Sequence, residues 1–118
     1  MGDRIIDLAD ALDRVQDDKE LLLELFDIFE ADFRVKRKEL DKYLTEKNAE
    51  MVRNIAHSVK GASGNISAQQ IRNLCLLMEE SASKGNLDPV PEALIQLDKA
   101  FADYQKEAQK IKDDYQVL

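Results

Sequence analysis

The chain has 118 residues, of which 44% are hydrophobic and 35% are charged, and its formal net charge is −7 at pH 7. A chain of this length can bury one core but not two ordinary ones, so we expect a single domain over residues 1–118. The acidic balance argues against nucleic-acid binding, which needs a basic face. No apolar run approaches about 18 residues and no basic segment precedes an apolar leader, so we expect a soluble cytoplasmic protein that does not enter a membrane.

The single histidine, His57, and the single cysteine, Cys75, limit the chemistry open to the chain. A lone cysteine cannot form an internal disulfide, and its place among regularly spaced apolar residues favours a small buried side chain over a reactive thiol. One histidine and one cysteine do not supply the ligand cluster that zinc needs. We therefore expect no metal site and no bound cofactor.

The first predicted helix is short, spans residues 5 to about 14 and carries two leucines one turn apart. Asp17 and Glu20 then have the spacing of an acidic capping box, and the helix that they open continues to about Leu44. The residues expected to face the core recur every three or four positions. They are Leu22, Leu25, Phe26, Phe29, Phe33, Leu40 and Leu44.

Two further helices follow in the middle of the chain. Asn48 is a suitable N-cap for a helix that runs to about Ile66. Ser67 and Gln70 have capping-box spacing for the next helix, which Gly85 ends. The apolar stripe of the earlier helix is Met51, Ile55, Val59, Ala62 and Ile66, and that of the later helix is Ile71, Leu74, Cys75, Met78 and Ala82.

The last helix is predicted to begin after Asp88, with Pro89 at its first position, and to be roughly 40 Å long. Short connections place successive helices antiparallel to one another. The predicted fold is therefore all-α, an antiparallel up-down-up-down four-helix bundle with a short extra N-terminal helix. The apolar residues of the last helix are Leu94, Leu97, Phe101, Tyr104, Ala108, Ile111 and Tyr115.

His57 lies on the polar face of its helix, roughly 160° from the centre of the apolar stripe. Lys60 and Gly61 follow one turn later on the same face, and Gly64 follows two turns later. An exposed imidazole has an ordinary pKa near 6.5, so at neutral pH much of it carries a free lone pair and can act as a nucleophile. Lys60 supplies a positive charge beside any anion formed on the ring, and no carboxylate shares this face near His57. The arrangement suits a phosphoryl group.

Each interior helix glycine costs about 1 kcal/mol relative to alanine, so Gly61 and Gly64 need an explanation. A large side chain at position 61 would overhang the space beside His57, whereas glycine leaves that space open to a reacting partner. Alternatively, the glycines permit the close approach of another helix and His57 is an ordinary surface residue. Spacing alone leaves both interpretations open.

The whole segment resembles the motif of the histidine phosphotransfer (HPt) domain family of two-component phosphorelays. That motif runs His-x-x-Lys-Gly-Ser/Ala-Ser/Ala and is followed by an apolar-Gly-Ala segment. Here the residues are His57-Ser58-Val59-Lys60-Gly61-Ala62-Ser63 and then Ile66-Ser67-Ala68. The resemblance extends over nearly the whole chain through Leu74-Cys75, Met78-Glu79-Glu80 and Lys84-Gly85-Asn86. One departure is Ser67, where the family commonly has glycine.

The resemblance implies a phosphoprotein of signal transduction that carries phosphoryl groups without kinase activity of its own. His57 would accept the group and exchange it with the aspartate of a response-regulator receiver domain, which holds Mg²⁺ and the acidic pocket, and a histidine or hybrid kinase would act upstream. Lys60 would support transfer electrostatically, Gly61 and Gly64 would provide access, and Glu79 is the candidate that orients the ring. We expect a monomer.

Leu21, Ile28 and Val35 recur on a second line of the long early helix, roughly 120° from the centre of its core stripe. Leu21 is expected to widen the buried face, whereas Ile28 and Val35 are predicted to form an apolar docking surface for a receiver. A helical interaction module that binds a partner here without covalent chemistry is the alternative function. The phosphotransfer domain of a chemotaxis-type kinase ranks below a standalone or hybrid-kinase module, because the chain ends soon after its last helix.

Overall fold

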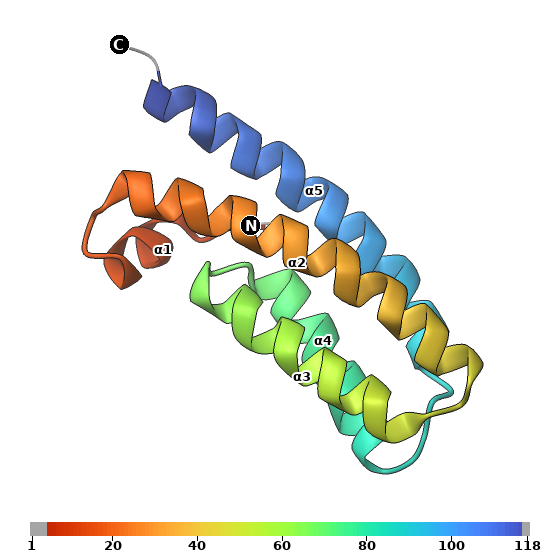
Figure 1. Cartoon of the computed structure of the whole chain (residues 1–118). Helices are drawn as coiled ribbons and strands as arrows, with labels where there is room; N and C mark the ends of the chain where they lie inside the picture. The colour runs from red at the N-terminus through yellow and green to blue at the C-terminus, as the bar shows by residue number, and fades with distance from the viewer. Residues whose placement is uncertain (1–4, 117–118) are drawn as a thin grey trace.

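A computed structural model describes residues 5–116, and within this range the chain forms five helices and no strand (Figure 1). In chain order the helices are α1 (Leu8–Arg14), α2 (Lys19–Thr45), α3 (Ala49–Asn65), α4 (Gln69–Ser83) and α5 (Val90–Gln116). Each helix from α2 to α5 packs against the next, and α5 packs back against α2. This closes an antiparallel four-helix bundle with α1 as an additional helix, so the predicted fold class is confirmed.

The four bundle helices differ in length, and this difference shapes the molecule. α2 and α5 each have 27 residues, whereas α3 has 17 and α4 has 15. The α2–α5 pair therefore extends past the hairpin of α3 and α4, as Figure 1 shows, and α1 packs against α2 at that end. The predicted overhang of the last helix is confirmed.

The apolar stripes of the four helices meet in one core, largely as their spacing predicts. On α5, every predicted residue from Leu94 to Ile111 is buried, and Tyr115 is half-buried. On α2, Leu25 and Leu44 are half-buried at the edge of the stripe while the other five predicted residues are buried. The centre of the core is aromatic: Phe33 stacks on Phe101 with ring centroids 4.1 Å apart, and the Tyr104 hydroxyl donates to the Phe26 carbonyl oxygen at 3.3 Å.

The buried face of α3 is rotated slightly from the predicted stripe. Val52, Ala56 and Ser63 are buried, whereas Met51 and Ala62 are only half-buried. α3 packs more extensively against α4 than against α2, so its buried face is turned toward α4. The polar face of α3 remains the one that carries His57.

The N-cap of α3 is predicted correctly, whereas the start of α2 is shifted by one residue. The Asn48 side chain accepts a hydrogen bond from the Met51 backbone N–H at 3.1 Å. α2 is capped by Asp18, whose carboxylate accepts from the Leu21 N–H at 3.0 Å, and not by Asp17, which has a positive φ of 62°. Asp17 and Asp18 are adjacent and have the same side chain, so either could be the N-cap of α2. The sequence alone does not say which of them is.

The starts of α1 and α5 also differ from the prediction. α1 begins at Leu8 with Asp7 as its N-cap, so Ile6 lies outside the helix, where it is completely buried. α5 begins at Val90, so Pro89 precedes the helix instead of occupying its first position. Gly85 ends α4 with a φ of 75°, as expected for a glycine after a helix.

Ser67 does not cap α4 as its spacing from Gln70 predicts. α4 follows Ala68 and has no side-chain cap, while Ser67 is fully buried in the left-handed region with a φ of 57°. This conformation favours glycine, which explains why a serine is unusual here. The Ser67 hydroxyl instead donates to the Asp10 carboxylate at 2.5 Å, and its carbonyl accepts from the Asp7 N–H at 3.0 Å. Both bonds tie α1 to the turn between α3 and α4.

Cys75 is completely buried in the core, as its position on an apolar stripe predicts. Burial raises the pKa of its thiol to about 12, and the negative charge of Glu79 adds to this effect. Because the thiolate is the reactive form of cysteine, this side chain serves as a small apolar group.

Candidate functional site

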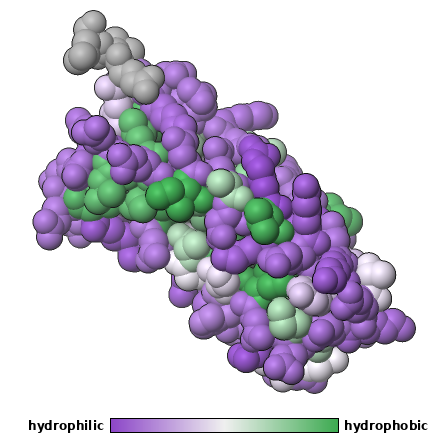
Figure 2. Space-filling model, in the orientation of Figure 1, coloured by the Kyte–Doolittle hydropathy of each residue, from purple (hydrophilic) through white to green (hydrophobic). Residues whose placement is uncertain are grey.

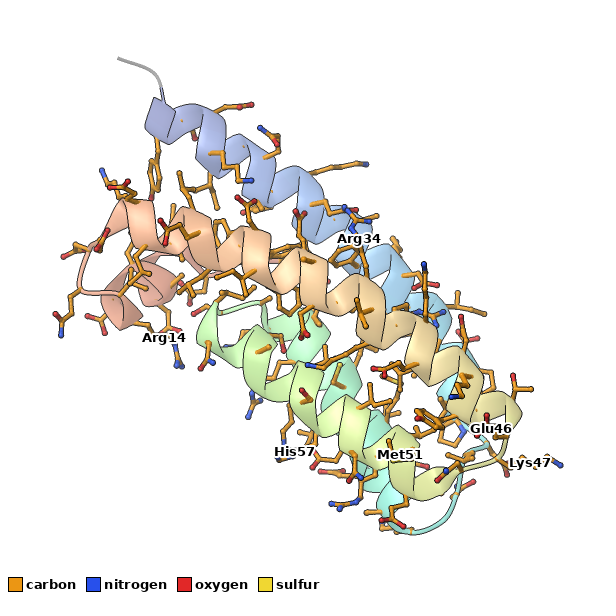
Figure 3. The ribbon with its side chains drawn as sticks, in the orientation of Figure 1. Arg14, Arg34, Glu46, Lys47, Met51 and His57 are labelled. Carbon is orange, nitrogen blue, oxygen red and sulfur yellow. The ribbon has the colours of Figure 1, made fainter. Side chains whose placement is uncertain are left out.

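His57 projects from the middle of α3 into solvent, on the side turned away from α2 (Figure 3). Its side chain is 64% exposed, whereas Ile55 and Val59 on the opposite side of the helix are buried. The outward orientation predicted from the periodicity of α3 is therefore confirmed. The ring is accessible to a partner molecule without any movement of the core.

A carboxylate does share the face around His57, contrary to the prediction from α3 alone. Glu79 of α4 approaches the ring from the side, with its Oε2 atom 2.6 Å from His57 Nδ1. Its other oxygen, Oε1, is buried and lies 2.6 Å from Lys60 Nζ. Glu79 thus joins the ring and the ammonium group in one cluster, His57–Glu79–Lys60, although α3 itself brings no carboxylate to this position.

The cluster determines which nitrogen of His57 is available for reaction. The Lys60 ammonium lowers the pKa of Glu79, the contact with His57 lowers it further, and partial burial opposes both effects. Glu79 is therefore ionised at neutral pH and can only accept hydrogen bonds. A neutral His57 ring in this contact donates its Nδ1–H to Glu79, so its lone pair lies on Nε2, the other ring nitrogen.

The two glycines of α3 differ in their surroundings. A Cβ atom built on Gly61 would have no atom within 4 Å, so the space beside His57 is open there, as the sequence predicts. A Cβ atom on Gly64 would lie 3.6 Å from Cδ of Arg72, a residue of α4. The open space therefore ends before Gly64, where the Arg72 side chain lies against α3. Arg72 is not a residue that the sequence pattern singles out.

The apolar flank of α2 is exposed at the positions predicted for docking. Ile28 and Val35 are 62% and 60% exposed, whereas Leu21 is 39% exposed. Ile28 borders a groove between α2 and α3, which is lined by Leu25, Ile28, Phe29, Asp32, Ala62, Asn65 and Ile66. The groove connects the flank of α2 to the helix that carries His57. Figure 2 shows apolar surface gathered over α1 and the start of α2, with smaller apolar areas farther along α2.

Two other kinds of site are absent from the part of the chain that the structure describes. Within residues 5–116, no three His, Cys, Asp or Glu side chains gather closely enough to hold a metal ion. Over the same range, each helix is too short or too polar to span a bilayer.

Comparison with known proteins identifies the family. The model of the Hpt domain family matches residues 24–107, which include α3, α4 and most of α2 and α5. The fold is similar to the crystal structure of histidine-containing phosphotransfer protein B (HptB) from Pseudomonas aeruginosa PAO1, with a TM-score of 0.82 and 26% sequence identity. The alignment covers 92% of this chain and 98% of that chain. No curated protein matches the chain. Given the family match, the bundle and its exposed histidine, the chain belongs to the Hpt domain family and is a histidine phosphotransfer carrier of phosphorelays.

Proposed function

We propose that Nε2 of His57 accepts a phosphoryl group from the aspartyl phosphate of a response-regulator receiver domain and returns it in the reverse reaction. In the forward step, the Nε2 lone pair attacks phosphorus, an N–P bond forms, and the bond between phosphorus and the aspartate oxygen breaks. The aspartate leaves as a carboxylate, and the proton on Nδ1 stays in place. The ring becomes positively charged in this step. The observation that carries the proposal is the contact between Nδ1 of this exposed ring and ionised Glu79.

The test is incubation of the full chain with a phosphorylated receiver domain. A phosphate on the chain that is labile in acid and stable in base would support transfer to histidine, because phosphoramidate and acyl phosphate bonds differ in these stabilities. Stable binding of the receiver without any transfer of phosphate would support the alternative, a helical interaction module.

In this scheme Glu79 positions the ring and stabilises its positive charge. Replacing Glu79 with glutamine keeps a hydrogen-bond acceptor but removes the charge, so we expect transfer to slow on the order of tenfold. Glu79→Ala should slow it further and reduce the population of the Nδ1–H tautomer, which the ¹⁵N chemical shifts of the ring report. Glu80→Gln, at an exposed neighbouring site of α4, is the control. Unchanged tautomer populations in Glu79→Ala would contradict the positioning role.

Lys60 is proposed to attract the phosphoryl oxygens while it holds Glu79. The attacking nitrogen of His57 has no proton to lose, so the proposed role of Lys60 requires no proton transfer. We expect Lys60→Ala to slow transfer at least about tenfold and Lys60→Arg to retain much of the rate. Single-turnover transfer from a receiver measures both. Lys99→Ala, on the exposed surface of α5, is the control for loss of one positive charge. Equal rates with lysine and alanine at position 60 would exclude the role.

The docking surface is proposed to include Ile28 and Val35, together with the groove that leads from Ile28 toward α3. Apolar side chains that are more than half exposed are typical of the centre of a protein interface. The receiver would cover these residues, Gly61 and His57 at once. The partners in the pathway would be such a receiver and an upstream histidine or hybrid kinase.

We propose that residues 1–118 form one domain, that it acts as a cytoplasmic monomer, and that it has no kinase activity of its own. Incubation of the chain alone with ATP should therefore leave His57 unphosphorylated.

A further inference from the structure

Arg72 of α4 lies on the same edge of the α3–α4 hairpin as Glu79. The two helices run antiparallel, and Arg72 lies beside Gly64 just as Glu79 lies beside His57. Gly64 follows His57 by seven residues on α3, and Arg72 precedes Glu79 by seven residues on α4. Seven residues correspond to two turns, so Arg72 meets α3 about 10 Å from His57 along the same side. Glu79 faces the reactive ring, and Arg72 occupies the next position along this edge.

The stem of the Arg72 side chain lies against α3, and among residues 5–116 its charge has no carboxylate partner. Atoms Cδ and Nε would lie 3.6 Å and 3.7 Å from a Cβ atom at position 64, so the stem of the side chain passes over Gly64. Other arginines of the chain are engaged, since Arg14 pairs with Asp10 and Arg37 pairs with Asp41 and Asp98. Within residues 5–116, no carboxylate pairs with the Arg72 guanidinium. In a chain with a net charge of −7, the described residues thus leave the charge of Arg72 without a carboxylate partner, on the helix edge that also carries Glu79.

The position of Arg72 suits contact with a carboxylate of a bound protein better than contact with the transferred phosphoryl group. A protein interface of ordinary size covers about 800 Å² on each partner, which corresponds to a radius of roughly 16 Å. A group about 10 Å from the centre lies inside such an area but too far from Nε2 to touch phosphorus during transfer. The guanidinium offers two parallel N–H donors, which match the two oxygens of a carboxylate.

We infer that Arg72 is a recognition residue that forms an ion pair with a surface carboxylate of the docked receiver domain. This inference rests on the proposed function, because it takes His57 as the centre of the interface. It also gives Gly64 a role different from access: without a side chain at position 64, the Arg72 stem can lie against α3.

The test compares Arg72→Gln with the parental chain in single-turnover transfer from the phosphorylated receiver that reacts fastest with the parental chain. We expect the half-saturating receiver concentration to rise roughly tenfold, the maximal rate to change less than about twofold, and the dependence on salt to become weaker. Titration of the unphosphorylated receiver by calorimetry should show the same loss of affinity. Arg34→Gln is the matched control, because Arg34 packs over the Phe101 ring beside α5, away from His57 (Figure 3).

A small phosphoryl donor distinguishes an effect on receiver docking from an effect on the transfer step itself. Phosphoramidate should phosphorylate Arg72→Gln and the parental chain at equal rates, since no protein has to dock. A slower reaction with phosphoramidate would overturn the inference in favour of contact with the phosphoryl group, and an unchanged half-saturating concentration would overturn it outright. Failure of the parental chain to accept phosphate on His57 from either donor would instead count against the proposed function, while the calorimetric comparison would still decide whether Arg72 recognises the receiver.

Discussion

Replacing His57 with glutamine should abolish phosphoryl transfer from a receiver and leave the bundle folded. Glutamine has no nucleophilic ring nitrogen, so no N–P bond can form at this position. The side chain is 64% exposed, so its replacement removes little from the core, and glutamine can still donate a hydrogen bond to Glu79. Transfer is measured by the phosphate retained on the chain after incubation with a phosphorylated receiver, and folding by helical circular dichroism and thermal unfolding.

The control for this experiment is Ser58→Ala, an exposed position next to His57 on α3. Undiminished phosphorylation of His57→Gln would mean that another residue is the acceptor. A large loss of helicity in His57→Gln would mean that the ring has a structural role, despite its exposure.

At Gly61, two substitutions should have opposite effects on stability and transfer. A Cβ atom at this position meets nothing within 4 Å, so Gly61→Ala should stabilise the fold by up to about 1 kcal/mol through its higher helix propensity. Gly61→Gln fills the space beside the ring with a long side chain. A misfit at the reacting centre is costly, so we expect transfer from a receiver to slow on the order of 100-fold.

Denaturant titration and single-turnover transfer measure these two effects. Phosphoramidate, which needs no docking surface, should still phosphorylate Gly61→Gln at near the parental rate. Ala102→Gln adds the same side chain to an exposed site on α5 and serves as the control. Destabilisation of several kcal/mol by Gly61→Ala would show that the glycine is packed against a neighbour. A parental transfer rate in Gly61→Gln would show that the receiver approaches from another direction.

Periodicity was a sufficient guide to the helices because each bundle helix buries one side and exposes the other. The burial of Phe29 and Phe33 on α2 and of Leu97 and Tyr104 on α5 follows from spacings of three and four residues. Helix ends were less predictable. Asp17 and Asp18 are chemically equivalent caps, and the register was decided by the backbone turn that precedes α2, in which Gln16 and Asp17 both have positive φ.

The contacts of Ser67 could not be predicted from the spacing of neighbouring residues. Its spacing from Gln70 favours a capping box, but the turn between α3 and α4 holds it at a positive φ, where its hydroxyl reaches Asp10 of α1, 57 residues earlier. The departure from the family's glycine was the one available signal, and it pointed to the backbone conformation. It did not reveal the partner, because no local spacing relates Ser67 to Asp10.

By itself, the sequence determined the class of the fold, the outward orientation of His57 and its neighbours Lys60 and Gly61, because all of these depend on the geometry of a single helix. The contact of Glu79 with His57 and the placement of Arg72 over Gly64 depend instead on how α4 lies against α3. A shift of that antiparallel register by one turn would bring other side chains to the ring. The packing of the whole bundle fixes the register, so only the tertiary structure decided which nitrogen of His57 is held and which faces solvent.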